Sequence, residues 1–243
     1  MCAFFSTWGL FRLAGKQSSI GRPIRTIAEQ AAAETGVLQR KAKAMRNLVV
    51  FDHPYGIGAW DNVPHRRSFS AALCKSLTDK MCERGEEVDV IDLVADAFDP
   101  AMSAEGLARW RAGVPIDEQT ADYQRRLVQA DRIVFVFPLW WEFMPARTKG
   151  FIDKVYAKDI LYTQEPGLKG MKTRIPHAEF VFVTVMGTPR MLYRIVLGSP
   201  LMKAMRRGLC FKTGIQRCRW ISYSGVDKLS EGQRKKLLLE ADV

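Results

Sequence analysis

The sequence feature that most constrains the fold is a continuous apolar run at residues 133–137, Ile-Val-Phe-Val-Phe, which contains no polar residue. A run so rich in β-branched and aromatic residues is typical of a strand buried on both faces, as in the interior of a parallel sheet. Pro138 ends the run, because proline has no amide hydrogen with which to continue a ladder. Leu139, Trp140 and Trp141 follow directly. We expect these side chains at the carboxyl end of a central strand, where open α/β sheets hold their ligands.

The two tryptophans at that edge of the sheet have two possible roles. Trp140 and Trp141 either form a flat wall against a planar ligand or fill the space between the sheet and the next helix. Their spacing alone does not separate these roles. The next helix is expected at residues 146–156, with Pro145 in its first turn, a position that proline favours.

Apolar runs alternate with helix-like segments along most of the chain. This alternation predicts a doubly wound α/β fold with five parallel strands and helices on both faces. Residues 101–113 and 162–176 are expected to be irregular or turn-rich connections. The expected strands span residues 48–51, 88–93, 133–137, 180–185 and 219–223, and the expected helices span residues 68–84, 117–130, 146–156, 200–209 and 230–239.

The first 44 residues do not read like the start of this fold. They hold seven basic residues against Glu29 and Glu34, a charge of +5, whereas an apolar strand begins just after Met45. An arginine-rich segment of this kind is either an upstream extension or an organelle-targeting leader. Because it contains two glutamates and no clear cleavage signature, we expect a poorly ordered extension at 1–44 and one domain at 45–243.

Composition excludes several classes of protein. The five cysteines include no CxxC pair, and with three histidines no zinc-like spacing appears, so no metal site is expected. An odd cysteine count without a secretory pattern predicts reduced thiols and a cytoplasmic location. No apolar run approaches the roughly 18 residues that a membrane span needs.

The formal charge of +11 is concentrated in two parts of the chain. Besides the first 44 residues, the stretch between Glu179 and Asp227 contains no acidic residue. Such a field attracts phosphate-bearing ligands, although a solvated basic surface explains part of it equally well. Its basic residues are Arg190, Arg194, Lys203, Arg206, Arg207, Lys212, Arg217 and Arg219.

A second candidate anion site is the start of the helix expected after the first strand. Ser68 is a suitable cap for that helix, and a helix N-terminus presents free amide hydrogens to a phosphate. Neither the Walker A spacing nor GxGxxG is present, so the segment is not a P-loop or a dinucleotide fingerprint. Many helices begin with serine without binding anything.

Four ordered segments of the chain resemble the flavodoxin-like NAD(P)H:quinone oxidoreductases. The most specific segment has the family's pattern Phe-Pro-Leu-x-Trp, followed by Pro-Ala and Lys-Gly. The resemblance covers about residues 45–226 and implies a flavodoxin-like strand order, 2-1-3-4-5. The matching residues are Phe137, Pro138, Leu139, Trp141, Pro145, Ala146, Lys149 and Gly150; His53 and Pro54; Ser68 and Phe69; and Asp92, Leu93, Phe98, Asp99 and Pro100.

The resemblance implies a noncovalent flavin, FMN or FAD, that is reduced by NAD(P)H and reoxidised by a quinone-like acceptor. The flavin carries the chemistry in such enzymes, and the protein orients it. By position, the implied cofactor-binding residues are His53, Ser68, Phe69 and Ser70 at the ribityl phosphate, Pro138, Leu139, Trp140 and Trp141 at the isoalloxazine, and Thr184 and Gly187 at the pyrimidine edge. The implied substrate-binding residues are Trp140, Tyr193, Arg190 and Arg194, with Tyr193 as the catalytic candidate.

The chain departs from the family at several positions. Ser70 stands where the family usually has asparagine, and Glu142 replaces an aromatic residue. No histidine follows Tyr193, so the family's histidine proton partner has no match. The resemblance also implies a homodimer whose sites are completed by the partner chain, and Trp110 is either part of that interface or a plug over the chain's own core.

Two other functions compete with a turnover enzyme. The first is a flavin-binding regulatory or electron-transfer partner subunit, as for the ancillary proteins of potassium efflux systems. The second is nucleic-acid binding by the acid-free stretch, because basic clusters bind phosphates. No nucleic-acid module is visible in the sequence, so we expect no nucleic-acid partner.

Overall fold

The computed structural model describes residues 44–61, 67–164 and 170–243. Residues Ala44–Val243 form one compact unit. The expected N-terminal extension lies outside the described residues, apart from Ala44. Among the helices of the described part, none is long and apolar enough to cross a membrane.

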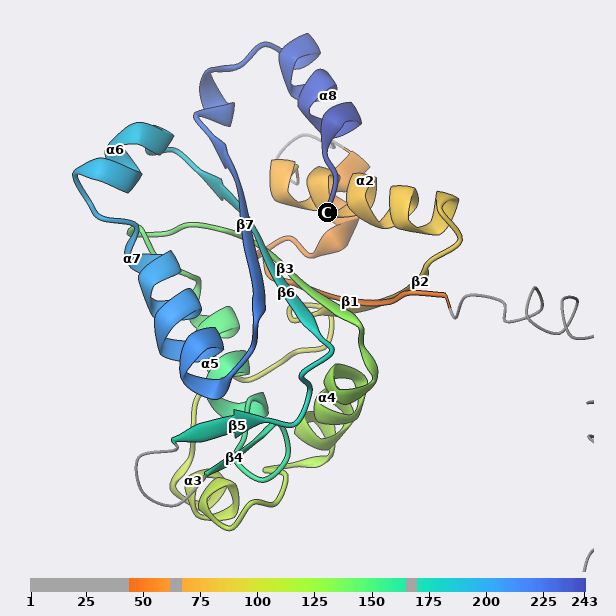
Figure 1. Ribbon diagram of the computed structural model, residues 1–243. Coiled ribbons are helices and arrows are strands. Elements are labelled where there is room, and N and C mark those ends of the chain that lie inside the picture. Colours follow the sequence, from red (N-terminus) through yellow and green to blue (C-terminus); the bar gives the residue numbers. More distant parts are fainter. Residues whose placement is uncertain (1–43, 62–66, 165–169) are drawn as a thin grey trace, which may run out of the picture. The chain divides into compact units, whose positions relative to one another are not determined.

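A parallel five-stranded sheet forms the centre of the fold (Figure 1), which confirms the predicted α/β class. The order of its strands is β2-β1-β3-β6-β7. Each strand corresponds to one of the apolar runs expected from the sequence. Their bounds are β1 (Arg46–Phe51), β2 (Glu87–Asp92), β3 (Arg132–Pro138), β6 (Glu179–Met186) and β7 (Arg217–Ser224).

Two further strands correct the numbering of the predicted order. β4 (Tyr162–Gln164) and β5 (Met171–Thr173) pair antiparallel in a separate small sheet, within the connection expected to be turn-rich. Each has three residues, too few for a recognisable alternation of apolar and polar positions. The order written 2-1-3-4-5 therefore becomes 2-1-3-6-7 along the chain.

Helices cover both faces of the sheet (Figure 1). The predicted helices are all present, and α3 is added in the stretch expected to be irregular, where Ser103 caps it by accepting a 2.9 Å hydrogen bond from the amide of Gly106. The helical elements are η1 (Ile57–Asp61), α2 (Phe69–Glu83), α3 (Ala104–Arg111), α4 (Glu118–Gln129), α5 (Ala146–Val155), α6 (Arg190–Ile195), α7 (Pro200–Met202), the π-helical η3 (Lys203–Phe211), η4 (Val226–Lys228) and α8 (Glu231–Glu240).

The core consists of two apolar layers, one on each side of the sheet. Val134 and Val136 of β3 face the layer under α2 and α8, whereas Phe135 and Phe137 face the layer under α4, α5 and η3. Successive side chains of a strand point to opposite faces. β3 therefore needs apolar residues at every position, which explains the continuous run in the sequence.

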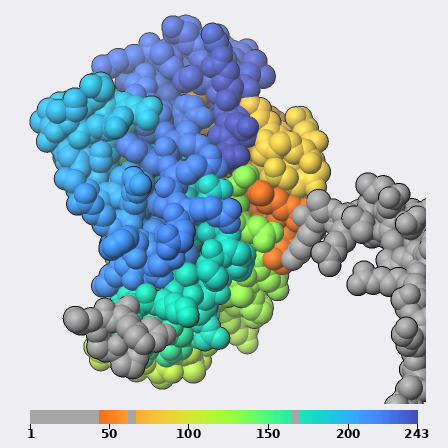
Figure 2. All heavy atoms as spheres, in the orientation of Figure 1, coloured from red at the N-terminus to blue at the C-terminus, as the bar shows by residue number. Residues whose placement is uncertain are grey.

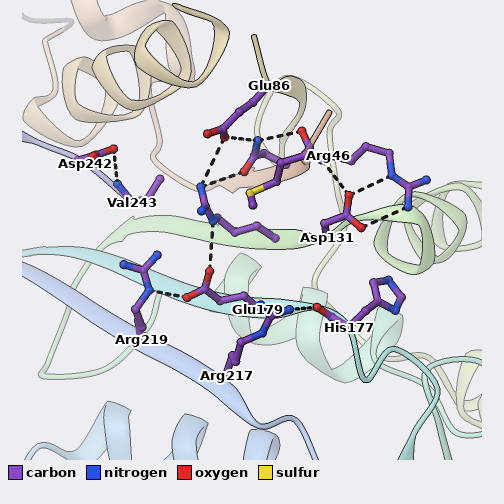
Figure 3. A network of polar contacts seen from close by, with 12 residues as sticks. Arg46, Glu86, Asp131, His177, Glu179, Arg217, Arg219, Asp242 and Val243 are labelled. Atoms are coloured by element: carbon purple, nitrogen blue, oxygen red, sulfur yellow. Dashed lines mark hydrogen bonds and ion pairs between the residues drawn. The ribbon is translucent and has the colours of Figure 1, made fainter. Parts of the chain in front are cut away.

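The amino edge of the sheet carries a network of ion pairs (Figure 3). Arg132, at the start of β3, lies 3.3 Å from Glu179 and 3.5 Å from Glu86. Arg219 contacts the other oxygen of Glu179, and Arg46 reaches Asp131 at 3.3 Å. Burial alone would raise the pKa of Glu179, but its contacts with Arg219 and Arg132 outweigh burial and lower it. These contacts lie at the amino ends of all five strands, counting Glu86, which directly precedes β2.

Candidate functional site

The candidate site lies at the opposite, carboxyl edge of the sheet. β1 and β3 are neighbours, but the chain leaves β1 toward α2 on one face and leaves β3 toward α5 on the other. Connections that diverge in this way open a crevice, which is where open α/β sheets bind ligands. Most of the predicted residues lie in the segments that begin at this edge, directly after β1, β3 and β6.

Asp52 joins the two sides of the crevice. Its carboxylate, at the end of β1, accepts hydrogen bonds from the amide and the hydroxyl of Thr148 at 2.9 and 2.8 Å. Thr148 lies in the first turn of α5, whose own cap residue, Pro145, makes no side-chain cap. Asp52 therefore caps α5 from another element. Burial raises the pKa of Asp52, partly offset by the bonds from Thr148.

His53 lies beside this buried carboxylate and is half-buried. Its Nδ1 accepts a 3.3 Å hydrogen bond from the amide of Tyr55. Burial lowers the pKa of His53, and the nearby charge of Asp52 offsets only part of that effect. The imidazole is therefore mainly neutral at neutral pH, and it offers a polar contact without a positive charge.

Asp92 shapes the loop that follows. Its carboxylate, at the end of β2, accepts a 2.7 Å hydrogen bond from the amide of Ile57 and two more from Val94 and Ala95. Gly56 approaches it so closely, with φ +69°, that an added Cβ would lie 3.1 Å from a carboxylate oxygen. A glycine is thus needed to start η1 at this point.

A cavity of about 520 Å³ opens at the start of α2. Ser68 caps that helix by accepting a 3.2 Å hydrogen bond from the amide of Ala71. The amide of Ala72 bonds to the Ser68 carbonyl, which leaves the amides of Phe69 and Ser70 without a partner inside the helix. The Ser70 side chain itself is buried. Ser68, Phe69 and Ala72 line the cavity, which therefore lies at the positive end of a helix dipole.

The opposite wall of this cavity comes from α8. Arg234 and Lys235 line it, and Arg67 adds a third cation, against Asp227 and Glu231. Trp60 of η1 forms an exposed aromatic wall, with the Lys75 ammonium 5.2 Å from its ring centroid. The α8 residues and Trp60 were not expected as site residues. No local pattern marks them, because only the tertiary structure brings α8 against α2.

Residues 140–143 form a tight, strained turn just after β3. Trp140 and Phe143 exchange two backbone hydrogen bonds of 3.0 Å. The two residues between them have positive φ, +51° at Trp141 and +63° at Glu142, a turn geometry that normally takes glycine or asparagine. The Trp141 side chain is 100% exposed. Strain of this kind costs roughly 1–3 kcal/mol per residue and is typical of functional sites.

Glu142 ties this turn to the loop after β6. One carboxylate oxygen accepts a hydrogen bond from the Thr188 hydroxyl, and the carbonyl accepts one from Tyr193 at 3.2 Å. The other carboxylate oxygen, Oε2, is buried and has no hydrogen-bond partner among the described residues. It is a buried acceptor that lacks a donor within the described part of the chain.

Tyr193 and Thr184 are placed in the core. Tyr193 is fully buried, and its hydroxyl accepts a bond from the Leu201 amide at 3.1 Å besides its contact with Glu142. Burial raises the pKa of Tyr193. Thr184 is also fully buried, and its hydroxyl accepts a 2.9 Å bond from the Trp220 indole. Neither side chain lies on a surface that a ligand reaches in this structure.

The other predicted residues divide between two regions. Pro138 and Leu139 are half-buried at the end of β3, and Gly187 is exposed after β6. Arg190 and Arg194 are exposed on α6 and line a separate cavity, which shares no residue with the one at α2. Trp110, which the sequence left as either an interface residue or a plug over the core, is half-buried on α3 with its indole nitrogen buried.

The arrangement fits a flavin nucleotide. The start of α2 offers amide donors and nearby cations for a phosphate, and the buried acceptor of Glu142 and the exposed tryptophans suit a planar, hydrogen-bonding ring. Within the described ranges, no group of three or more His, Cys, Asp or Glu side chains suits a metal ion.

The chain is similar to several proteins with oxidoreductase names. The chain is 26% identical, over 80% of its length and 91% of the relative's, to a protein of Haemophilus influenzae called an uncharacterized NAD(P)H oxidoreductase. It is also 26% identical, over 74% of its length and 91% of the relative's, to an FMN-dependent NADH:quinone oxidoreductase of Lactiplantibacillus plantarum.

The solved structures extend the likeness to the fold. An NAD(P)H:quinone oxidoreductase from Methanothermobacter marburgensis superposes with a TM-score of 0.67 at 24% identity, covering 81% of this chain and 94% of that one. The family model described as "Flavodoxin-like fold" matches residues 45–241. The resemblance seen in the sequence is therefore confirmed, and the chain belongs to the flavodoxin-like fold family.

Proposed function

We propose that the protein is an NAD(P)H-dependent flavin oxidoreductase that passes a hydride from a nicotinamide nucleotide, by way of a bound flavin, to a quinone-like acceptor. The observation that carries the proposal is that one edge of the sheet holds both a helix start suited to a phosphate, after β1, and a strained turn with a wholly exposed tryptophan, after β3. The names of the relatives support the same class of reaction.

The start of α2 holds the flavin phosphate in this proposal. The amides of Phe69 and Ser70 donate to it, and Arg67 and Lys235 balance its charge from the cavity walls. His53, being mainly neutral, contacts the adjacent ribityl chain. When bound, the flavin supplies the two-electron chemistry, and the protein supplies binding and orientation.

The turn at residues 140–143 orients the ring system. Pro138 and Leu139 lead the chain to the turn, and Trp140 and Trp141 cover the ring, which removes the exposed indoles from water. Gly187, which has no side chain, allows close approach from the β6 side. Tyr193 acts as a positioning residue, because its hydroxyl holds the Glu142 carbonyl.

A homodimer completes the proposal. The segment from α6 to η3 exposes several large apolar side chains, and exposed apolar surface favours interaction with another chain. We propose that a second copy covers them and contributes to the substrate pocket. Light scattering at micromolar concentration should give twice the chain mass, and a monomeric mass would contradict this part. The exposed residues are Met191, Leu192, Ile195, Val196, Leu197 and Phe211.

The first test is flavin binding. The purified protein, mixed with FMN or FAD and desalted, should retain a yellow flavin spectrum, and mass spectrometry of the released flavin decides between the two cofactors. A colourless protein would contradict the proposal. Lys235→Ala should weaken flavin affinity about fivefold through loss of one phosphate contact, whereas Lys236→Ala, on the same helix but outside the cavity, should not.

The second test separates an enzyme from a partner subunit. The flavin-loaded protein should consume NADH or NADPH continuously when benzoquinone is present. Flavin-loaded protein that shows no turnover would favour a regulatory or electron-transfer role over the enzyme. Only this measurement distinguishes the two, because both functions need the same flavin site.

A further inference from the structure

A second cavity, of about 500 Å³, lies beside the edge strand β7. We call it the basic pocket. It opens between α6, α7 and η3, and residues 190–211 form much of the left side of the molecule in Figure 2. No acidic side chain lines it. Its cations are Arg190, Arg194, Lys203, Arg206 and Arg207.

These five cations are unpaired. None of them makes an ion pair or side-chain hydrogen bond with another residue of the described chain. Like charges gathered in one cavity repel each other, so the arrangement does not stabilise the fold. A multiply charged anion would relieve that repulsion and satisfy several donors at once.

The backbone makes a tight reversal at the basic pocket. Gly198 (φ +70°) and Ser199 (φ +52°) reverse the chain between α6 and η3. The approach is so tight that a Cβ at Gly198 would lie 2.8 Å from the Lys203 Nζ. Lys203 and Arg207 then lie about one turn apart on η3, a π-helix, a form that is rare and often found at functional sites.

An aromatic side chain completes the lining. Trp220 of β7 lines the basic pocket, and its indole is held in place by the bond to Thr184 and by the Tyr193 ring, 5.5 Å away between centroids. Cys218 lies two residues earlier on the same face of β7 and also lines the pocket. An aromatic wall beside arginines suits a base or ribose joined to phosphates.

We propose that the basic pocket binds a nucleotide that carries at least two phosphate groups. Its size is that of a small-molecule site rather than of an extended groove for a polymer. The same chemistry occurs in a 2′-phosphorylated nicotinamide nucleotide and in a nucleoside diphosphate. The inference goes beyond the proposed function, because binding here requires neither bound flavin nor turnover.

The basic pocket is connected to the candidate flavin site through the chain. Arg190 begins α6 immediately after the loop at Thr188, and Thr188 donates to Glu142 in the strained turn. A ligand bound to Arg190 would therefore contact the segment at residues 188–190, which is hydrogen-bonded to the turn at residues 140–143. The 2′-phosphorylated nicotinamide nucleotide is therefore one of the two ligands that the experiment compares.

Cys218 provides a direct readout of occupancy. The pKa of Cys218 lies below its usual value, because of a hydrogen bond with Cys210 and the nearby Arg206 guanidinium, despite burial. Thiolates react with alkylating agents, and thiols do so only slowly. Alkylation by iodoacetamide, followed peptide by peptide in a mass spectrometer, measures Cys218 separately from the exposed Cys82 on α2.

The experiment compares nucleotides on the full chain, with and without added flavin. Adenosine 2′,5′-bisphosphate, ADP and AMP are each titrated at low salt. The first two should slow Cys218 alkylation at least about fivefold with saturation, and AMP should do so much less, because fewer charged contacts form. Cys82 should be unaffected in every case. Tighter binding of adenosine 2′,5′-bisphosphate than of ADP identifies the 2′-phosphorylated reductant, and the reverse identifies a nucleoside diphosphate.

Variants test which residues hold the ligand. Arg206→Ala combined with Arg207→Ala should raise the Kd for the bisphosphate about tenfold or more, and both side chains are exposed and unpaired, so the fold should persist. Lys172→Ala on β5 removes an exposed cation outside the pocket and should change nothing. Because the Arg206 change also alters the Cys218 thiol, the Kd is measured by calorimetry.

Three results would overturn the proposal. The first is no saturable protection of Cys218 by either bisphosphate or diphosphate. The second is equal loss of affinity in the Lys172→Ala control, which reflects net charge alone. The third is tight binding of single-stranded DNA with none of the small nucleotides, which assigns the basic pocket to a polymer. None of these results depends on whether the flavin reaction occurs.

Discussion

The amino edge of the sheet and the basic pocket use the same residue type in opposite ways. At the amino edge, Arg46, Arg132 and Arg219 each contact a carboxylate (Figure 3). In the basic pocket, five cations gather around a cavity with no carboxylate in its lining. Paired, partly buried charges hold strands together, whereas unpaired ones remain available to a ligand. Most of the formal net charge of +11 comes from the first 44 residues and the basic pocket, whereas the opposite charges of the amino edge largely cancel.

Two carboxylates, one half-buried and one buried, show the same contrast. Glu179, at the amino edge, is held by two arginines that lower its pKa against the effect of burial. At the carboxyl edge, burial raises the pKa of Asp52, and the hydrogen bonds from Thr148 and the nearby charges of Arg147 and His53 offset only part of that effect. The folded structure therefore favours the ionised form of Glu179 at the amino edge, whereas it disfavours the ionised form of Asp52 at the candidate site.

The largest expected effect is at the amino edge. Glu179→Ala removes a carboxylate shared by Arg132 and Arg219, and the Arg132 side chain is only 11% exposed. A buried charge that loses a partner is costly, so we expect a loss of about 2 kcal/mol in the free energy of unfolding. Urea denaturation measures it. The control Glu231→Ala, on exposed α8, should leave the unfolding midpoint unchanged. An equal loss of stability in this control would contradict a special role for the ion pairs of the amino edge.

The next effect is kinetic and lies at the rim of the basic pocket. Arg190→Ala or Arg194→Ala should raise the KM for NADPH about tenfold more than that for NADH, as for loss of ~1.4 kcal/mol of uniform binding. The preference for NADPH should weaken as salt is raised. Neither change should alter the unfolding midpoint, because both side chains are unpaired. Equal effects on the two nucleotides would reject a role in reading the 2′-phosphate.

A smaller effect is expected from relief of strain. Trp141→Gly should stabilise the fold by about 1 kcal/mol, because glycine tolerates φ +51° and the exposed indole buries nothing. The same change should weaken flavin affinity. Ala97→Gly is the matched control, since exposed Ala97 also has positive φ (+49°) but lies outside the site. It should be stabilising without any change in flavin affinity.

The smallest effect concerns acid pH. A carboxylate with a lowered folded-state pKa contributes stability that is complete above its unfolded value, near 4.5 for Glu179, and is lost as pH falls through the folded value. Asp52, with a raised pKa, acts in the opposite direction. Unfolding midpoints measured from neutral pH down to roughly pH 3 should fall less steeply in Glu179→Ala than in the wild type. Parallel curves would show that other carboxylates dominate.

Local patterns predicted most of the fold. The continuous run in β3 is required by a strand covered on both faces, and Ser68 caps α2 through its own helix, so both signals lie within a few residues. β4 and β5 escaped prediction because three residues carry no period. α3 lies on a polar segment whose helix depends on the Ser103 cap more than on an apolar face.

The candidate site was predicted where it depends on sequence motifs and missed where it depends on distant contacts. The sequence by itself determined the strand and helix order, the start of α2 and the segment from Pro138 to Trp141, because caps and periodicity act locally. Only the tertiary structure decided that Tyr193 is buried, that Asp52 caps α5, that α8 closes the α2 cavity and that five cations share a pocket. Those properties depend on which remote segments pack together, since burial and charge pairing are set by neighbours in space.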